Sequence, residues 1–289
     1  MTNLLSLGHG YAARRIPPAL PAGWSVTGST RDPGHAQKLQ EAGIDALIWD
    51  PEDDSAPLAG AIPGATHLVS SMPPDKSGAD PALPALAQLH APRLRWVGYL
   101  SASSVYGDTG GDWIDEDAPT KPGTERGKAR LAAEDAWRAW CDERGMTLAI
   151  FRIAGIYGPG RSAIEALQEG RAKRLVKPGH VFNRIHVTDL GRIIAAAAAQ
   201  EAGGIFNLCD DLPAPPQDLI THAAALTGLP CPPEEPYDAQ ALSPMARSFY
   251  SENKRLRSRR VGPELGVTLR YPDYRAGLAA IAAIAAGDA

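Results

Sequence analysis

The stretch LLSLGHGYAA, residues 4–13, decides the fold of this 289-residue chain. Its apolar run ends at Leu7, Gly8 and Gly10 follow at once, and Ala13 comes three residues later. A strand that enters a Gly-x-Gly-x-x-Gly/Ala turn and then a helix is the phosphate-binding unit of dinucleotide-binding folds. Gly8 allows the tight turn, Gly10 lets the backbone approach a pyrophosphate, and Ala13 keeps helix and strand close. The stretch therefore predicts a dinucleotide site with its pyrophosphate at a helix N-terminus.

Two features next to this turn bear on the prediction. Pro17 and Pro18 break the following helix early, so the first crossover of the chain must be short or irregular. His9 lies within the turn, and two interpretations stay open for it: a contact to phosphate or substrate, or a simple exposed loop histidine.

Short apolar runs alternate with helical stretches through the first half of the chain, which is the pattern of βαβ units and a parallel sheet. We expect strands at residues 4–7, 24–28, 46–49, 67–70, 96–101 and 147–153, and a long helix over 127–144. Residues 181–194 and 204–208 look like a return to the sheet, whereas prolines cluster at 213–216 and 230–233.

These patterns predict an α/β fold, a Rossmann-type doubly wound parallel sheet with a smaller interleaved C-terminal substrate lobe. We assign residues 1–160 to the dinucleotide-binding domain, with 181–211 returning to it. Residues 161–180 and 212–289 then form the smaller, substrate-binding lobe.

Composition excludes several classes of function. A net charge of -4 gives no global attraction to nucleic acid or to an anionic membrane, and we expect the basic run 254–260 to be a solvated surface feature. The three cysteines are far apart and form no C-x-x-C pair, so neither a disulfide framework nor a metal site is indicated. No apolar run approaches the roughly 18 residues of a membrane span. We expect a cytoplasmic protein.

Two further motifs resemble a known family. Residues 151–161, FRIAGIYGPGR, are very similar to the R-x-x-x-x-Y-G-P-G segment of extended short-chain dehydrogenase/reductases, the NAD-dependent epimerase/dehydratase family. Residues 101–107, SASSVYG, are similar to the family's S-S-x-x-V-Y-G at the end of a central strand. Further matches at 183–190, 204–211 and 272–278 extend the resemblance over nearly the whole chain. It implies a bound nicotinamide dinucleotide and a small-molecule substrate between two lobes.

The family's Tyr-x-x-x-Lys pair is altered here, because the matching segment, residues 126–134, reads RGKARLAAE. Anchoring on Glu134 puts Arg126 in the tyrosine position and Arg130 in the lysine position, whereas sliding by two pairs Thr124 with Lys128. Neither register contains tyrosine, so the chain resembles the atypical, tyrosine-lacking branch of the family. An arginine stays protonated near neutral pH and cannot exchange a proton, but it can bind an anion or polarise a carbonyl.

Other groups could take over part of the missing chemistry. The hydrogen-bonding Ser/Thr of the family falls on Ala102, and Ser103 and Ser104 are neighbours that could substitute or could simply cap the strand end. Tyr106 or Tyr157 could supply a phenol, although aromatic residues in their motifs usually pack against cofactor or core. The candidate catalytic residues are therefore Ser103, Ser104, Arg126 and Arg130.

The end of the second expected strand predicts NADP over NAD. An acidic residue grips the ribose 2′-hydroxyl in NAD-selective proteins, but residues 28–31 read GSTR, with no carboxylate before Asp32. The guanidinium of Arg31 offers a planar fork to a 2′-phosphate; the alternative is a surface arginine paired with Asp32. We expect the cofactor to contact Gly8, Gly10, Tyr11, Ala13, Ser29, Thr30, Arg31, Ser70, Ser101 and Tyr157.

Two functions from different classes remain. The first is an NADP-binding enzyme of the epimerase/dehydratase type, an oxidoreductase or epimerase on a polar, sugar- or nucleotide-like substrate. The alternative is a non-catalytic NADP-binding sensor or partner-binding module. The resemblance also suggests a homodimer, and it gives His186 and Asp189 a structural role between the lobes. The candidate substrate contacts are Tyr106, Arg152, Arg161 and Arg184.

Overall fold

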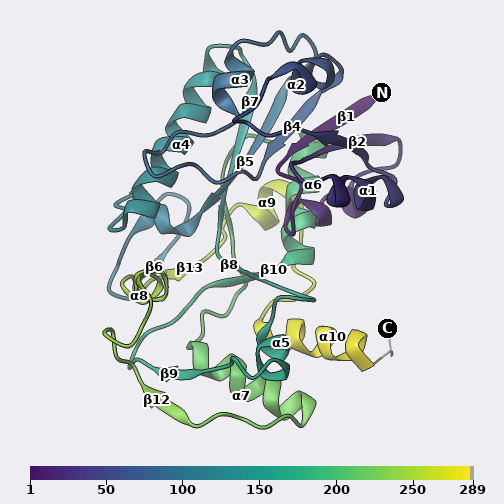
Figure 1. The fold of residues 1–289 in the computed structure, drawn as a ribbon. Coiled ribbons are helices and arrows are strands. Elements are labelled where there is room, and N and C mark those ends of the chain that lie inside the picture. The colour runs from purple at the N-terminus through teal and green to yellow at the C-terminus, as the bar shows by residue number, and fades with distance from the viewer. Residues whose placement is uncertain (287–289) are drawn as a thin grey trace.

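A seven-stranded parallel sheet forms the centre of the molecule (Figure 1). The computed structural model describes residues 1–286. The strand order is β11-β7-β5-β4-β1-β2-β3. Strands β2 and β3 are added on one side of β1, and the later strands are added on the other side, beginning with β4. This confirms the predicted Rossmann-type fold. The strands are β1 (Thr2–Leu7), β2 (Trp24–Thr30), β3 (Asp45–Ile48), β4 (His67–Ser70), β5 (Trp96–Ala102), β7 (Thr147–Ile153) and β11 (Gly204–Leu208).

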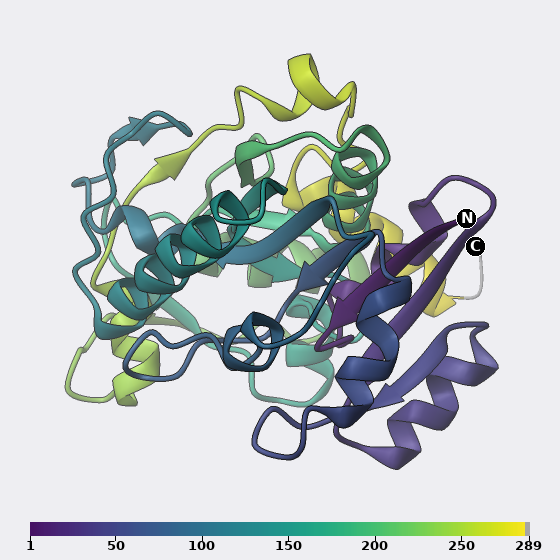
Figure 2. The ribbon, with the colours of Figure 1, turned by 90° about the horizontal axis from the view of Figure 1, so that it is seen from above.

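Helices cover both faces of the sheet (Figure 2), which is why its inner strands are apolar on both sides. One face packs against α1 (Pro33–Glu41), α6 (Val187–Gln200) and α9 (Val261–Leu265). The other packs against α2 (Ala56–Ala61), η3 (Ile62–Gly64), α3 (Leu83–Ala87) and α4 (Glu125–Asp142). No helix within residues 1–286 is long and apolar enough to cross a membrane.

The first crossover is irregular, as the two prolines predict. It consists of two short 3-10 helices, η1 (Ala13–Arg15) and η2 (Pro17–Ala19), with Pro17 starting the second. Helix α6 packs directly on this crossover, because Gly191 leaves room for it. A Cβ atom at Gly191 would lie 2.1 Å from the carbonyl oxygen of Arg15.

A second lobe lies below the carboxyl ends of the strands in Figure 1. It contains β8 (Gly155–Tyr157), α5 (Ala163–Gln168), β9 (Arg174–Val176), β10 (Arg184–His186), α7 (Pro216–Thr227), β12 (Glu234–Pro236) and α10 (Tyr274–Ala286). Strand β10 pairs with β8 and not with the central sheet, so from 181–194 only the helical part returns to it. Between the lobes lie η4 (Ser103–Tyr106), α8 (Pro244–Tyr250) and the pair β6 (Trp113–Ile114) with β13 (Arg255–Leu256).

Two segments from the C-terminal part of the chain fasten the lobes together. The buried carboxylate of Asp189 accepts the backbone N–H groups of Arg270 at 2.9 Å and Tyr271 at 2.8 Å.

The basic run is only partly solvated, because Arg259 pairs with Asp115 at 3.2 Å and Lys254 is buried. The expectation of a solvated surface run is therefore confirmed for Arg259, whose side chain is 63% exposed, and wrong for Lys254.

A buried ion pair joins α4 to the end of the sheet. Arg152 Nη2 on β7 lies 2.8 Å from Glu134 Oε2 on α4, and the two side chains are 4% and 0% exposed. The hydroxyl of Ser101, on β5, donates to Glu134 Oε1 at 2.5 Å. Three elements therefore meet on one buried carboxylate.

Replacing Glu134 by alanine should lower the free energy of unfolding by about 3 to 5 kcal/mol, because the guanidinium of Arg152 is left buried without a partner. Urea unfolding followed by circular dichroism measures the change. The matched control is Glu125→Ala, which removes an exposed partner of Lys128 on the same helix and should cost less than about 1 kcal/mol. Equal losses in the two variants would contradict a stabilising role for the buried pair.

Candidate functional site

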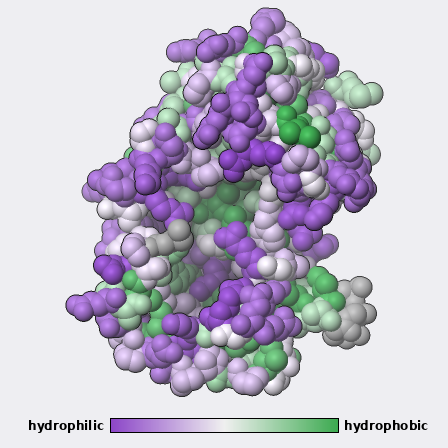
Figure 3. All heavy atoms as spheres, in the orientation of Figure 1, coloured by the Kyte–Doolittle hydropathy of each residue, from purple (hydrophilic) through white to green (hydrophobic). Residues whose placement is uncertain are grey.

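A cleft of about 830 Å³ lies between the carboxyl ends of the central strands and the second lobe. Figure 3 shows it as the hollow in the middle of the molecule. One wall comes from the glycine turn after β1, from η4 and from the first turns of α4; the opposite wall comes from β8, the segment before β10 and α8.

A second hollow of about 400 Å³ continues from the cleft towards the end of β2. Gly8, Gly10 and Ser71 line both hollows, so they form one groove along the strand ends. In open α/β sheets ligands bind at such a point, where the strand order reverses. The groove has the position and the two-part form that an extended dinucleotide requires.

The glycine turn is tight, and contacts with neighbouring strands hold it in place. Gly8 has φ 71°, and a Cβ atom there would lie 2.9 Å from Met72 Cγ. Ser29 holds the turn from β2: its hydroxyl accepts the N–H of Gly8, and its carbonyl accepts the N–H of His9, both at 2.9 Å. The residues present therefore fit a dinucleotide, and Ser29 shapes the turn in addition to lining the groove.

His9 is almost fully buried, so its interpretation as an exposed loop histidine is wrong. Its Nδ1 lies 2.9 Å from the hydroxyl of Ser6, and its ring occupies the space above Gly28. Burial, followed by the neighbouring His35 and Arg14, lowers the pKa of His9 to about 4. The imidazole is neutral at pH 7 and brings no charge to a phosphate.

At the end of β2 the groove is lined by Thr30, Arg31 and Asp50. The Arg31 side chain is 73% exposed, and its Nη1 lies 3.5 Å from Asp50 Oδ2. Asp32 does not pair with Arg31, because its carboxylate caps α1 by accepting the N–H of Gly34 at 2.8 Å. The exposed guanidinium of Arg31 therefore lies at this end of the groove with Asp50, and not Asp32, as its partner.

Two of the expected cofactor contacts lie elsewhere. Ser70 is buried in β4, outside the groove, and the next residue, Ser71, lines both hollows and donates its hydroxyl to the carbonyl of Gly8. Ala13 is buried beneath the turn, where it packs against the sheet. Successive side chains of a strand face opposite sides, so a prediction that is wrong by one residue selects a side chain in the core and not one in the groove.

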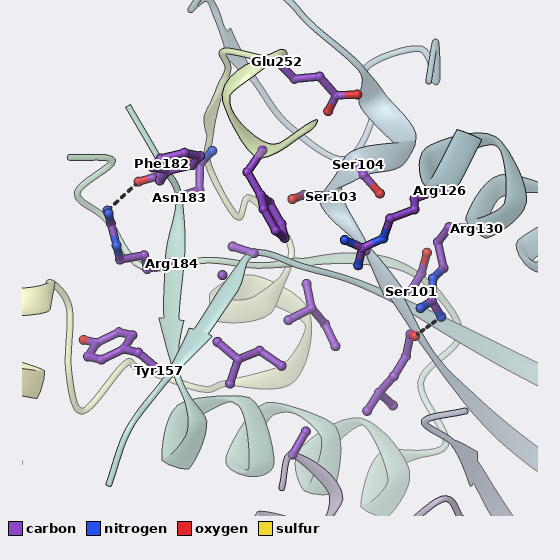
Figure 4. A pocket seen from close by; sticks show the side chains of 18 of the residues that line it. Ser101, Ser103, Ser104, Arg126, Arg130, Tyr157, Phe182, Asn183, Arg184 and Glu252 are labelled. Atoms are coloured by element: carbon purple, nitrogen blue, oxygen red, sulfur yellow. Dashed lines mark hydrogen bonds between the residues drawn. The ribbon is translucent and has the colours of Figure 1, made fainter. Parts of the chain in front are cut away.

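The four candidate catalytic residues come together on one wall of the cleft (Figure 4). Ser103 and Ser104 begin η4, and Arg126 and Arg130 follow the N-cap of α4. Arg130 Nη1 donates to the hydroxyl of Tyr99 at 2.9 Å and to the carbonyl of Leu100 at 3.0 Å. Arg126 reaches further into the cleft, with Cζ 5.4 Å from the centre of the Phe249 ring.

The structure corrects two substrate assignments. Arg152 forms the buried ion pair with Glu134 described above and does not line the cleft. The hydroxyl of Tyr106 is buried next to it and donates to Asn207 Oδ1 at 2.7 Å. Both side chains point into the body of the protein, where Arg152 Cζ lies 4.8 Å from the centre of the Tyr106 ring.

Tyr157 lines the cleft, but its hydroxyl points away from Arg126 and Arg130 (Figure 4) and donates to the carbonyl of Asp273 at 3.2 Å. Burial raises the pKa of this phenol well above its usual value. Tyr11 also lines the cleft, and its hydroxyl donates to the carbonyl of Pro159 at 3.2 Å. None of the three motif tyrosines, Tyr106 included, presents a free phenol to the cleft.

Two further arginines differ in their freedom. Arg161 lines the cleft beside the glycine turn, with Cζ 5.7 Å from the centre of the Tyr11 ring. Arg184 is buried at the cleft wall and donates to the carbonyls of Phe182 at 2.9 Å and Ala214 at 3.0 Å. Burial lowers the pKa of Arg184 to about 10, and its guanidinium serves mainly to hold β10 in place.

Six cleft residues from the C-terminal part of the chain were not among the candidate site residues: Ala246, Ser248, Phe249, Tyr250, Glu252 and Lys254. Phe249 is the second-last residue of α8 with 52% of its surface exposed, and Glu252 and Lys254 follow the helix. Lys254 Nζ lies 2.7 Å from Glu252 Oε2 and donates to the carbonyl of Gly107 at 2.6 Å. Lys254 and Gly107 are 147 residues apart in the sequence, so this contact depends on how distant segments pack.

Comparison with known proteins gives the following. The family model described as "NAD dependent epimerase/dehydratase family" matches residues 82–209. The chain is 30% identical to Protein YeeZ of Escherichia coli, over 94% of this chain and 97% of that one. It is 46% identical to a solved, functionally unknown conserved protein from Silicibacter pomeroyi, with 99% of each chain covered and a TM-score of 0.87. Human epimerase family protein SDR39U1, solved with NADPH, shares the fold at 18% identity, with a TM-score of 0.75 over 97% of this chain and 99% of that one.

The buried His9 should make stability depend on pH. Its pKa is lower in the folded protein, about 4, than the value of about 6.5 in an unfolded chain. As the pH falls, the unfolded state therefore binds a proton at His9 before the folded state does. The stability that the folded protein gains from the neutral His9 is lost between about pH 6.5 and pH 4. Unfolding in urea at a series of pH values should show this fall, and His9→Gln should make it shallower without removing it, because burial also lowers the pKa values of His67, His180 and His186 to about 4. The exposed His90→Gln is the control, and the interpretation is wrong if both variants keep the slope of the unsubstituted protein.

Proposed function

Since this chain belongs to the NAD-dependent epimerase/dehydratase family, we propose that it is an NADP-dependent oxidoreductase or epimerase acting on a polar, anionic small molecule. The observation that carries the proposal is the continuous groove along the strand ends. It begins beside Arg31, passes the glycine turn and opens into a cleft lined by Ser103, Ser104 and Arg126. The groove accommodates a cofactor, and the cleft a substrate.

The preference for NADP rests on the groups at the end of β2. No carboxylate of β2 reaches the ribose position, since Asp32 is occupied as the cap of α1. The hydroxyl of Thr30 and the guanidinium of Arg31 line that end of the groove, and both suit a 2′-phosphate.

The preference for an anionic substrate rests on the charges of the cleft. Its lining includes the cations Arg126, Arg130, Arg161 and Lys254 but a single carboxylate, Glu252, which Lys254 already pairs. Within residues 1–286, neither Arg126 nor Arg161 makes an ion pair with an acidic side chain. A cleft lined by one sign of charge concentrates ligands of the opposite sign.

The bound nicotinamide would exchange hydride with the substrate, and the protein supplies binding and electrostatics. The hydroxyls of Ser103 and Ser104 stand at the strand end, where they can hydrogen-bond a substrate carbonyl or hydroxyl. Arg126 can stabilise negative charge that develops on that oxygen. It cannot act as the general acid, because a guanidinium keeps its proton near neutral pH.

The same geometry gives the second candidate, a non-catalytic NADP-binding sensor, one observation in its favour. The hydroxyls of Tyr106 and Tyr157 both donate hydrogen bonds to other atoms of the protein. Neither phenol therefore replaces the tyrosine that the family uses at the position of Arg126. A sensor would show cofactor-dependent changes in partner binding without turnover of any substrate.

Calorimetric titration with NADPH and NADH tests the cofactor. We expect NADPH to bind at least ~10-fold more tightly, because a charge-assisted hydrogen bond contributes about 1.5 to 3 kcal/mol. Arg31→Ala should remove most of this preference and leave NADH binding unchanged. The control is Lys38→Ala, an exposed lysine on α1 outside the groove. Equal affinity for the two cofactors in the unsubstituted protein would overturn the NADP assignment.

Arg126→Ala should lower kcat/KM by about 100-fold, because a fixed charge facing a developing oxyanion is worth about 2.7 to 4 kcal/mol. The substrate is found first by screening phosphorylated and carboxylated sugars and sugar nucleotides for NADPH oxidation or NADP reduction. NADPH affinity should stay within about twofold of its original value. Arg138→Ala, on an exposed part of α4, is the matched control. Full activity of the Arg126 variant would remove this residue from the site.

A further inference from the structure

The cleft contains an exposed aromatic side chain that the proposed function does not use. Phe249 of α8 lines the cleft, and 52% of its surface is exposed. Small-molecule sites bury most of the surface of their ligand against apolar and aromatic side chains, and a few polar groups fix its orientation. The ring of Phe249 therefore offers a surface that a bound molecule can cover.

The neighbouring residue in the chain anchors the end of α8. Tyr250 is buried, and the centre of its ring lies 5.3 Å from that of His180 and 5.2 Å from that of Phe182. Successive side chains of a helix point about 100° apart, so Phe249 points in another direction than Tyr250. It meets the guanidinium of Arg126, whose Cζ lies 5.4 Å from the centre of its ring. An apolar ring and a cation therefore border the same part of the cleft.

Apolar side chains also form much of the remaining lining. Leu100 of β5, Ile153 of β7 and Ile156 of β8 line the cleft, and Figure 3 shows apolar residues at the bottom of the hollow. Ala102 adds a methyl group at the position where the resemblance to the family expects a hydroxyl. Such a lining suits a ligand with an apolar body whose polar groups are gathered at one end.

The polar side chains of the cleft offer a sugar few acceptors. A sugar has several hydroxyl groups that must donate, and arginine has no acceptor. Among the described residues that line the cleft, the amide is Asn183 and the carboxylate is Glu252. Asn183 Oδ1 accepts the N–H of Leu256 at 2.7 Å, and Glu252 pairs with Lys254 through Oε2 while its Oε1 is shielded from solvent. A buried hydroxyl without a partner is unfavourable, so the cleft favours a ligand with few hydroxyl groups.

We propose that the substrate is an aromatic anion, a flat ring that lies on Phe249 and carries a carboxylate or phosphate group facing Arg126. The inference rests on the proposed function and narrows its anionic substrate from sugars to aromatic acids. The guanidinium fork suits the oxygens of either acid, and paired rings attract each other beyond the area that they bury. A sugar acid would meet the cation and leave the ring of Phe249 uncovered.

Calorimetry with two matched pairs of probes tests the proposal: cinnamate against glucuronate, and phenyl phosphate against glucose 6-phosphate. Each pair shares its charged group and differs in its body. In the NADPH-saturated protein, the aromatic member of at least one pair should bind ~5-fold more tightly than the sugar, and that pair identifies the acid. Phe249→Ala should remove the advantage and weaken the sugar by less than about twofold. The control is Leu226→Ala, an exposed apolar residue of α7 outside the cleft, which should change neither pair.

Two further variants separate the ring from its bulk. Phe249→Tyr keeps the ring and should keep the advantage, whereas Phe249→Leu should keep only part of it. Equal affinities within both pairs, or an advantage that survives Phe249→Ala, would overturn the inference, and normal NADPH binding would leave the proposed function standing. If NADPH does not bind, the proposed function fails, and the same titrations without cofactor still decide whether the cleft recognises the ring.

Discussion

The buried carboxylate of Glu134 is the point on which the geometry of the site depends. It binds Arg152 from β7 and Ser101 from β5, so it fixes α4 against the carboxyl ends of two central strands. Residues 126, 130 and 134 are spaced by four and lie on one face of α4. From Glu134 in the core this face leads through the half-buried Arg130 to Arg126 in the cleft. A charge buried with its partner thereby positions a second charge that lines the cleft.

The second wall of the cleft depends on C-terminal segments that return to the sheet. Lys254 reaches Gly107 beside η4, and Asp189 at the start of α6 holds the backbone at Arg270 and Tyr271. Gly277 lets α10 pack against Tyr157, since a Cβ atom there would lie 2.2 Å from the phenol oxygen. These contacts explain why two lobes with few shared elements form one cleft.

Sequence reasoning reaches the features that follow from local patterns. The apolar runs give the seven strands within a few residues, and the anchor at Glu134 places Arg126 and Arg130 on the face that the structure shows. It fails where the direction of a side chain decides: Ser71 lines the groove in place of Ser70, and Arg152 faces a buried carboxylate. The Glu252 and Lys254 pair is out of reach, because it depends on how distant segments pack.

The arginines on α4 change what the cleft can do, not only how it binds. A phenol in this position can both donate and accept a proton, but it is neutral until it loses one. A guanidinium carries a permanent positive charge and its planar fork suits carboxylate and phosphate oxygens. With the other phenols of the motifs turned to protein acceptors, the wall of the cleft favours steps in which negative charge develops on oxygen. Under the proposed function, electrostatic stabilisation is therefore the main contribution of this helix.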